Sequence, residues 1–258
     1  MSRIHEAFEN KKAFIPFITC GDPDLETTKK LVIAMAENGA DLIELGIPFS
    51  DPTAEGPVIQ EADNRALSNG ATTAKVMAMA KELRKTVKVP MVFMTYANVV
   101  FAYGAEKFLS EAKAAEMDGL ILPDVPFEEK EEFAALCQAY DMDLISMIAP
   151  TSKQRIRMIA KEAKGFIYVV SSMGVTGVRS QITTDIASLI EEVRSVTDIP
   201  CAVGFGISTP ETAAKMAKLS DGAIVGSAIV RQIAQYGKDS IEPVASFVKA
   251  MSDAVHNS

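Results

Sequence analysis

The chain has 258 residues, a formal net charge of -8 and a pI near 5.0. This acidic balance argues against a nucleic-acid backbone as the partner, because displacing the counterions of a nucleic acid requires a basic patch. Hydrophobic residues make up 48% of the chain and charged residues 23%, which is typical of a globular protein with a sizeable core.

Cysteine and histidine usage limits the possible chemistry. Cys20, Cys137 and Cys201 are scattered with no CxxC pair, so neither a disulfide framework nor a zinc site is indicated. The two histidines, His5 and His256, lie near the termini, which disfavours a histidine metal site or a Ser/His nucleophile. We expect no metal and no bound cofactor. The N-terminus resembles no signal peptide, and no stretch approaches the roughly 20 apolar residues of a membrane span, so we expect a cytoplasmic protein.

Short apolar runs between glycine and proline residues predict a series of strands, and helical periodicity follows each of them. The expected strands are 13–19, 42–47, 91–96, 118–125, 143–150, 165–172, one with its loop in 200–208, and one beginning at 221. The expected helices are a short one near 4–8, then 25–38, 58–68, 73–87, 105–116, 127–140, one starting near Ser152, 186–196, 210–217, one entered directly at Gly226 and Ser227, and 241–254. Pro16 predicts a strand end or irregular pairing in the first strand.

Eight strand–helix units without a linker-like shift in composition predict an α/β fold. We expect a (β/α)8 TIM barrel with an extra N-terminal helix, forming a single domain over residues 1–258. An open doubly wound sheet is the alternative, but the absence of GxGxxG after the first strand favours the barrel. The site of a barrel lies at the carboxyl ends of its strands, where Glu44, Asp51, Glu55 and Asp124 are all expected.

The segment 41–60 contains the strongest chemical signal. Glu44 lies inside an apolar strand, and Asp51 and Glu55 lie on a following loop that prolines keep irregular. One carboxylate on a strand end opposite two on a loop is suited to acid/base chemistry, and burial is expected to raise the pKa of Glu44. The alternative is structural, since a strand-end glutamate often caps a helix or accepts hydrogen bonds from loop amides.

Glycine motifs follow the last three strands: GVTG at 174–177, GFG at 204–206 and GS at 226–227. Backbone amides at such loops and at a helix N-terminus form an anion site, so we predict a phosphorylated substrate. Glycine also serves turns for purely conformational reasons. Since the motifs contain no Lys or Arg, backbone dipoles are expected to carry the interaction.

A stripe of apolar and aromatic residues lies at the remaining strand ends, between the glycine motifs and Glu44. Its members are Phe17, Met94, Ile121, Ile148 and Tyr168. Such a stripe is often plain barrel core. If it lines a pocket, the pocket suits a flat apolar group attached to a phosphorylated tail.

With these residues in view, the chain resembles the tryptophan synthase alpha subunit family over nearly its whole length. The shared motifs, in family order, are PFITCGDP, ELGIPFSDPTAEGPVIQ, YAN (96–98), PDVP (123–126), GVTG, GFGIS and VGSAIV. The resemblance implies a carbon–carbon lyase that cleaves indole-3-glycerol phosphate to indole and glyceraldehyde 3-phosphate. Indole would pass to a pyridoxal-phosphate beta subunit for tryptophan synthesis in an α2β2 heterotetramer.

The resemblance also implies roles for individual residues. Glu44 matches the catalytic glutamate, and Glu55 stands where the family usually carries an aspartate that handles the proton of the indole nitrogen, which is a departure. Asp51 and Thr176 match positions that couple loop closure to the beta subunit. The matched substrate-binding positions are Phe17, Met94, Ile121, Ile148, Tyr168, Thr176, Gly177, Phe205, Gly206, Gly226 and Ser227.

Two other functions fit the same residues. Another phosphate-binding barrel, such as an isomerase acting on a sugar or indole phosphate, would use a similar anion site but would release no indole. The other possibility is a regulatory binding subunit, in which Glu55 in place of the usual aspartate would mark a relaxed catalytic demand. Such a subunit would act on the beta subunit with negligible cleavage of its own. The intact Glu44 and the three glycine motifs favour the lyase.

Overall fold

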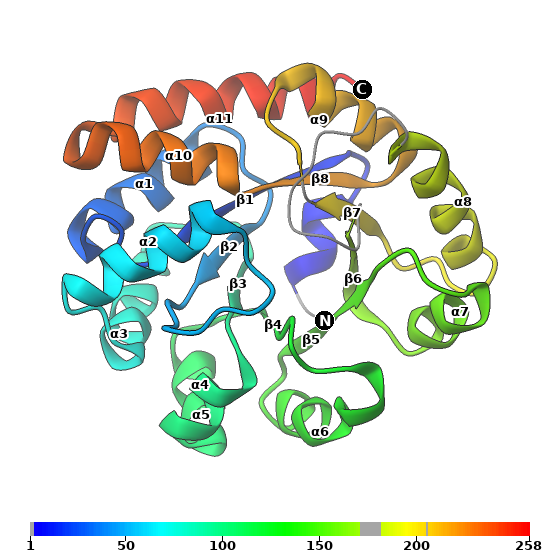
Figure 1. Ribbon diagram of the computed structural model, residues 1–258, viewed down its shortest axis with the longest axis horizontal. Coiled ribbons are helices and arrows are strands. Elements are labelled where there is room, and N and C mark those ends of the chain that lie inside the picture. Colours follow the sequence, from blue (N-terminus) through cyan, green and yellow to red (C-terminus); the bar gives the residue numbers. More distant parts are fainter. Residues whose placement is uncertain (1–2, 171–181, 205) are drawn as a thin grey trace.

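The computed structural model describes residues 3–170, 182–204 and 206–258. Parallel strands close into a barrel in the order β1 to β8, with each strand paired to its sequence neighbours and β8 paired to β1 (Figure 1). The strands are β1 Ala13–Thr19, β2 Ile43–Gly46, β3 Met91–Met94, β4 Gly119–Ile121, β5 Asp143–Ile148, β6 Lys164–Val170, β7 Cys201–Gly204 and β8 Gly222–Val225. The predicted (β/α)8 barrel is confirmed.

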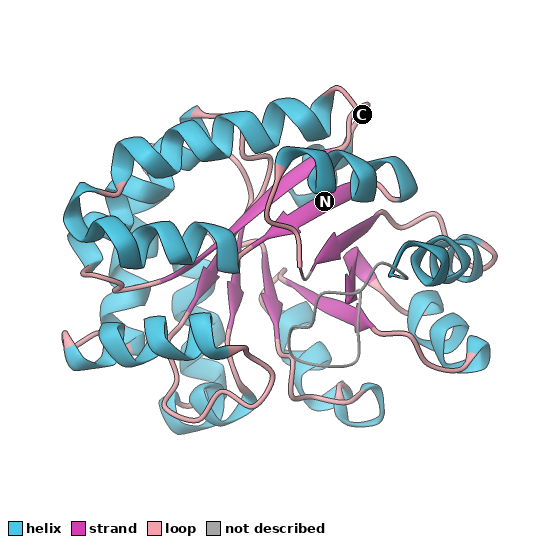
Figure 2. Cartoon of the chain, turned by 45° about the horizontal axis from the view of Figure 1, so that its top comes forward, coloured by secondary structure: helices cyan, strands magenta, loops and turns pink. Residues whose placement is uncertain are grey.

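Helices surround the strands as an outer layer (Figure 2). They are α1 Leu25–Glu37, α2 Pro57–Ser68, α3 Thr73–Leu83, α4 Ala97–Tyr103, α5 Ala105–Ala114, α6 Glu131–Ala139, α7 Lys153–Lys161, α8 Ile182–Arg194, α9 Pro210–Leu219, α10 Ser227–Tyr236 and α11 Ile241–His256, with 3-10 turns η1 Arg3–Phe8, η2 Phe127–Glu129 and η3 Gly237–Asp239. None of the described helices is both long and apolar enough to cross a membrane.

Several predicted boundaries differ from the observed ones. The strand expected over 118–125 ends at Ile121, because the prolines at 123 and 126 interrupt regular structure after it. The helix expected over 127–140 is split into η2 and α6. Helix α4 was not predicted, and α8 begins at 182 instead of 186. Pro16 lies where β1 changes partner: pairing with β8 extends to Pro16, and pairing with β2 begins at Phe17.

The core has two parts. One part fills the barrel, and its members include Ile15, Leu42, Val92 and Phe166. Ile4 and Ala7 of η1 belong to this interior group, and the ring of Phe8 lies 5.7 Å from that of Phe166, so η1 closes the amino-terminal end of the barrel. The other part lies between the strands and the helices.

Aspartates at the amino-terminal end join neighbouring strands. Asp41, Asp118 and Asp221 lie just before β2, β4 and β8, and each accepts a backbone N–H from the start of the preceding strand. The donors are Phe14 of β1, Met91 of β3 and Cys201 of β7, at 2.7, 2.9 and 2.8 Å respectively. An aspartate just before the second strand therefore helps to fix the register of three strand pairs, β1–β2, β3–β4 and β7–β8.

Each of these aspartates also has a cationic partner. Asp118 lies between Arg3 at 2.7 Å and Arg84 at 3.1 Å, and Asp221 pairs with Arg194. The Asp118 and Arg84 side chains are each 5% exposed, so this ion pair lies away from solvent.

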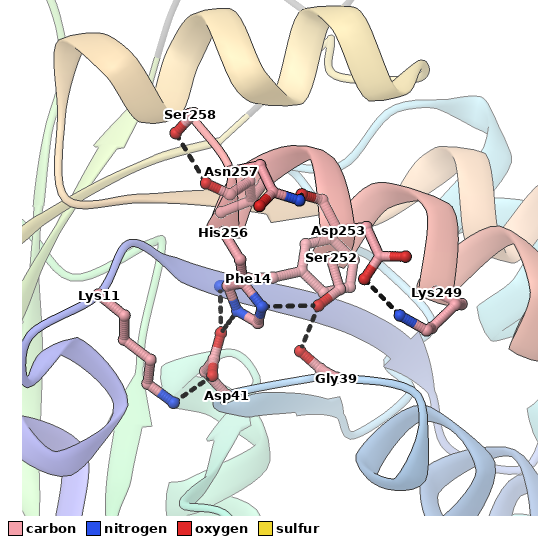
Figure 3. A network of polar contacts seen from close by, with 11 residues as sticks. Lys11, Phe14, Gly39, Asp41, Lys249, Ser252, Asp253, His256, Asn257 and Ser258 are labelled. Atoms are coloured by element: carbon pink, nitrogen blue, oxygen red, sulfur yellow. Dashed lines mark hydrogen bonds and ion pairs between the residues drawn. The ribbon is translucent and has the colours of Figure 1, made fainter.

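Asp41 connects the C-terminal helix to the barrel (Figure 3). Lys11 pairs with one carboxylate oxygen, and His256 Nε2 lies 2.7 Å from the other. On α11, Ser252 donates a hydrogen bond to the Gly39 carbonyl at 2.8 Å. The end of the chain is thus held beside the start of β2.

Candidate functional site

Glu44 is a buried carboxyl group on β2. It is the second residue of β2, it pairs in register with Phe17 and Val92, and its side chain is fully buried. Neither carboxylate oxygen has a hydrogen-bond partner among the described residues. Burial, and then the charge of Glu55, raise the pKa of Glu44 well above its usual value. The described residues thus contain no helix end or loop amide that Glu44 caps, and the structural alternative for this residue is not supported.

Glu55 approaches this group from the loop between β2 and α2. It directly precedes Gly56, the residue at the N-terminal boundary of α2. Burial raises the pKa of Glu55 to about 7. Burial raises the pKa of Tyr168 on β6, and the charges of Glu44 and then of Glu55 raise it further. The charge of this loop carboxylate is the second cause, after burial, of the raised pKa of Glu44.

Tyr96, just after β3, holds the loop that carries Glu55. Its hydroxyl accepts the backbone N–H of Ala54 at 3.0 Å, and its ring centroid lies 5.2 Å from that of Phe49. Tyr96 belongs to the YAN motif but was not among the expected site residues. The sequence signal that could have indicated a role for Tyr96 in the site is an aromatic residue with a hydroxyl group at the end of a strand.

The other two carboxylates expected at this end, Asp51 and Asp124, are exposed. Ser50 donates its hydroxyl hydrogen to Asp51 at 2.5 Å. Asp124 accepts the backbone N–H of Ala97 at 3.1 and 3.2 Å, so it caps α4. Asp124 was expected among the site carboxylates, and its role in the structure is instead to fix the start of that helix.

The apolar stripe mostly faces the barrel interior. Phe17, Met94, Ile121 and Tyr168 all belong to the interior core and are at most 8% exposed. Ile148 does not, because it packs in the layer between strands and helices. Side chains alternate along a strand, and on β5 the inward-facing ones are Ile145 and Met147. The expectation that Ile148 joins the pocket is therefore wrong.

The glycine motifs are described in part. Gly226 is the residue at the N-terminal boundary of α10, and a side chain there would lie 3.3 Å from the Phe17 ring. Gly206 has a φ of 75°, a backbone conformation that favours glycine, and a side chain there would meet no atom within 4 Å. Ser227 is the first residue of α10. Thr176, Gly177 and Phe205 lie outside the described residues.

Within the described part of the chain, no group of His, Cys, Asp or Glu side chains is arranged to hold a metal ion. The chemistry visible at this end of the barrel is that of the buried Glu44 carboxyl and the half-buried Glu55 carboxyl beside an apolar interior. Gly206 and Gly226 follow the neighbouring strands β7 and β8.

Comparisons with known proteins agree on one family. The sequence profile of the family described as tryptophan synthase alpha chain matches residues 4–256. A tryptophan synthase alpha chain from Lacticaseibacillus casei is 47% identical over 255 residues, which covers 99% of this chain and 96% of that protein.

Solved structures show the same likeness. A tryptophan synthase subunit alpha from Legionella pneumophila superposes with a TM-score of 0.91 and 36% identity, covering 100% of both chains. A chain of the tryptophan synthase complex from Pyrococcus furiosus gives a TM-score of 0.85 and 34% identity, covering 93% of this chain and 98% of that one.

Proposed function

This chain belongs to the tryptophan synthase alpha chain family, and from that premise we propose that Glu44 and Glu55 are its two catalytic carboxylates. The activity of the family is the cleavage of indole-3-glycerol phosphate to indole and glyceraldehyde 3-phosphate, and the chain is a lyase of tryptophan biosynthesis. The observation that carries the assignment of residues is the burial of Glu44 without a hydrogen-bond partner among the described residues.

The chemistry requires a group that can both give and take a proton. Cleavage of the carbon–carbon bond becomes feasible when C3 of the indole is protonated, because the ring can then accept the electron pair of the breaking bond. Burial and the charge of Glu55 raise the pKa of Glu44, which favours the protonated form of its carboxyl. Glu44 gives this proton to C3, and the resulting carboxylate removes the proton of the glycerol hydroxyl as the aldehyde forms. The two transfers leave Glu44 protonated again.

Glu55 is assigned to the indole nitrogen. Protonation at C3 places positive charge on that nitrogen, and an ionised carboxylate nearby stabilises it. With a pKa of about 7, Glu55 is ionised in a useful fraction of molecules at neutral pH. Its side chain is one methylene longer than the aspartate usual in the family, so its carboxylate reaches the ring from a different depth.

The remaining predicted residues supply binding. Phe17, Met94, Ile121 and Tyr168 hold the flat indole in the barrel interior. Backbone N–H groups at Gly206, Gly226 and Ser227 hold the phosphate, supported by the positive end of the α10 dipole. Thr176, Gly177 and Phe205 complete these two subsites in the proposal.

The partner is the beta subunit, since alpha chains of this family function with it and a structure of the complex is among the relatives. We infer an α2β2 assembly in which the beta subunit holds the pyridoxal phosphate. Asp51 and Thr176 are assigned to loop closure at the contact with that subunit. Closure excludes water and keeps neutral indole from escaping.

The test is indole release from indole-3-glycerol phosphate in the presence of the beta subunit. Glu44→Gln is expected to lower kcat by roughly 100- to 10,000-fold, the usual contribution of a positioned acid/base group. Glu55→Asp is expected to retain activity, since it restores the usual family residue. Activity that survives Glu44→Gln would refute the assignment.

The same experiment separates the alternatives. An isomerase would consume the substrate without releasing indole. A regulatory subunit would change the rate of the beta reaction normally while the wild-type chain released negligible indole.

A further inference from the structure

A buried hydroxyl group without a hydrogen-bond partner lies at the carboxyl-terminal end of β1. Thr19 is the last residue of this strand, it is 1% exposed, and its hydroxyl oxygen has no partner among the described residues. The Thr19 backbone is used in a turn, since its carbonyl accepts the N–H of Asp22 at 3.3 Å. Buried polar groups are rarely left unpaired, so the free hydroxyl requires an explanation, and a contact with a bound ligand supplies one.

Thr19 shares the interior face of the barrel with Glu44. Side chains alternate along a strand, and Phe17, two residues before Thr19, belongs to the interior core. On β2, Leu42 belongs to the same core, and Glu44 follows it by two residues. Phe17 is in register with Glu44, and Thr19 is in register with Gly46. The Thr19 side chain therefore lies one interior position nearer the carboxyl-terminal end than Glu44, on the neighbouring strand.

The position of β1 in the barrel places Thr19 between the two proposed subsites. Strand β1 pairs with β8 on one side and with β2 on the other (Figure 1). Strand β8 leads into Gly226 and Ser227 of the proposed phosphate site, and β2 carries Glu44. In indole-3-glycerol phosphate, the glycerol chain joins the indole ring to the phosphate. A substrate that reaches both subsites therefore crosses the carboxyl-terminal end of β1 with this chain.

Glycine residues stand at the ends of both neighbouring strands. Gly46 is the last residue of β2, and Gly226 directly follows β8. A β-carbon at Gly46 would lie 2.6 Å from the Phe17 ring, and one at Gly226 would lie 3.3 Å from it. The Phe17 side chain thus lies against both flanking strand ends, one interior position below Thr19. A glycerol chain on this apolar surface has the Thr19 hydroxyl as a polar partner.

The substrate offers a matching group. Of its glycerol hydroxyls, the one on the carbon bonded to indole loses its proton as the aldehyde forms. The middle hydroxyl takes no part in the bond cleavage and remains in glyceraldehyde 3-phosphate. It loses hydration when the substrate enters the barrel, so it requires a partner there. A threonine hydroxyl can both donate and accept a hydrogen bond.

We propose that Thr19 is a substrate-binding residue whose hydroxyl group forms a hydrogen bond with the middle hydroxyl of the glycerol chain. The proposal rests on the lyase activity and on the assignments of Glu44 and of the phosphate site made above. The bond is present both before and during cleavage, because the middle hydroxyl is unchanged by the reaction. A contact of this kind lowers KM and leaves kcat largely unchanged.

The experiment compares Thr19→Val with the wild type in the complex with the beta subunit. Valine has nearly the same shape but carries a methyl group in place of the hydroxyl, so the middle hydroxyl of the substrate is left unpaired. The kcat/KM for indole release is expected to fall about 5- to 100-fold, mainly through KM, which is the usual cost of an unpaired buried hydroxyl. Thr19→Ala removes the same hydroxyl without adding a methyl group and is expected to show a loss of similar size.

Two ligands show whether the effect belongs to the middle hydroxyl. Indole-3-propanol phosphate has the indole and the phosphate but neither hydroxyl, and its inhibition constant is expected to be the same for Thr19→Val and the wild type. The deoxy substrate, in which hydrogen replaces the middle hydroxyl, is expected to be cleaved by the wild type with a reduced kcat/KM. Thr19→Val is expected to cleave the deoxy substrate as well as the wild type does, since both changes remove the same hydrogen bond.

Two further variants are the matched controls. Thr19→Ser keeps the hydroxyl and is expected to restore most of the kcat/KM that Thr19→Val loses. Ser240, just before α11, is another buried residue whose hydroxyl has no partner among the described residues. It lies between η3 and α11 and is no member of the interior core, so Ser240→Ala is expected to leave kcat/KM unchanged.

Two outcomes overturn the proposal without touching the lyase assignment. The first is a Thr19→Val enzyme with the kcat/KM of the wild type. The second is a Thr19→Val enzyme that binds indole-3-propanol phosphate more weakly by the same factor as its kcat/KM falls, because Thr19 would then act through the shape of the pocket. Full activity of Glu44→Gln would instead refute the assignment of the catalytic pair, so the two failures are distinguishable.

Discussion

The two ends of the barrel use carboxylates in opposite ways. At the amino-terminal end, Asp41, Asp118 and Asp221 each accept a backbone N–H and each have a cationic partner. At the carboxyl-terminal end, Glu44 is buried without a hydrogen-bond partner among the described residues, and Glu55 has a raised pKa. Paired carboxylates join strands, while unpaired ones keep a high affinity for a proton and are available for chemistry.

The largest expected effect is the loss of stability when a paired carboxylate at the amino-terminal end of the barrel is removed. Asp118→Ala leaves the buried Arg84 guanidinium without its carboxylate partner and Met91 without its acceptor. Removing one member of a buried pair typically lowers the free energy of unfolding by about 3 to 5 kcal/mol. Urea denaturation measures this loss, and kcat per folded molecule is expected to remain unchanged. A loss below about 1 kcal/mol, the range of exposed pairs, would contradict the comparison.

At the carboxyl-terminal end, replacing the unpaired Glu44 is expected to raise the free energy of unfolding relative to the wild type as the pH increases. The pKa of Glu44 is raised in the folded state, so its protonated form is favoured there, and the wild type loses stability as pH rises above the unfolded value of about 4.3. Each pH unit up to the folded pKa lowers the free energy of unfolding by about 1.4 kcal/mol. Glu44→Gln removes this dependence, so its stability relative to the wild type should increase between pH 5 and pH 8.

Urea denaturation of both proteins at these two pH values tests the sign. Glu55→Gln serves as the comparison, since a folded pKa of about 7 predicts a similar dependence that ends near pH 7. A difference between Glu44→Gln and the wild type that stays constant with pH would show that Glu44 titrates like an exposed glutamate.

The smallest expected effect concerns an ion pair that is exposed instead of buried. Lys249 and Asp253 form an ion pair one turn apart on α11, and their side chains are 57% and 53% exposed (Figure 3). Asp253→Asn is expected to lower the free energy of unfolding by at most about 0.5 kcal/mol, the usual value of such a helical pair. Thermal denaturation with and without added salt measures it. A loss comparable to that of Asp118→Ala would show that burial does not distinguish the two pairs.

Much of this arrangement could be predicted from the sequence because its signals are local. Apolar runs between glycine and proline mark the strands, and a carboxylate inside such a run made Glu44 conspicuous. Helix α4 was missed because its seven residues follow a strand directly and have little room for a periodic pattern. Ile148 was misplaced because a motif match does not determine which side of a strand a residue faces.

The contacts that come from distant segments were out of reach of such patterns. Asp22, just after β1, looks like an ordinary turn residue, yet it accepts two hydrogen bonds from Arg65 of α2, 43 positions away in the chain. The hydrogen bond from Ala54 to Tyr96 likewise joins residues 42 positions apart in the chain.

Closure of the barrel by β1 and β8 has a consequence for synthesis on the ribosome. Ala13 of β1 pairs with Gly222 of β8, so the first strand emerges long before its second partner exists. At the usual elongation rates of about 5 to 20 residues per second, this interval lasts roughly 10 to 40 s. Throughout that time the nascent chain presents an open, apolar strand edge, and such edges promote association between chains. Slower translation of the last quarter of the message should therefore lower the yield of folded protein.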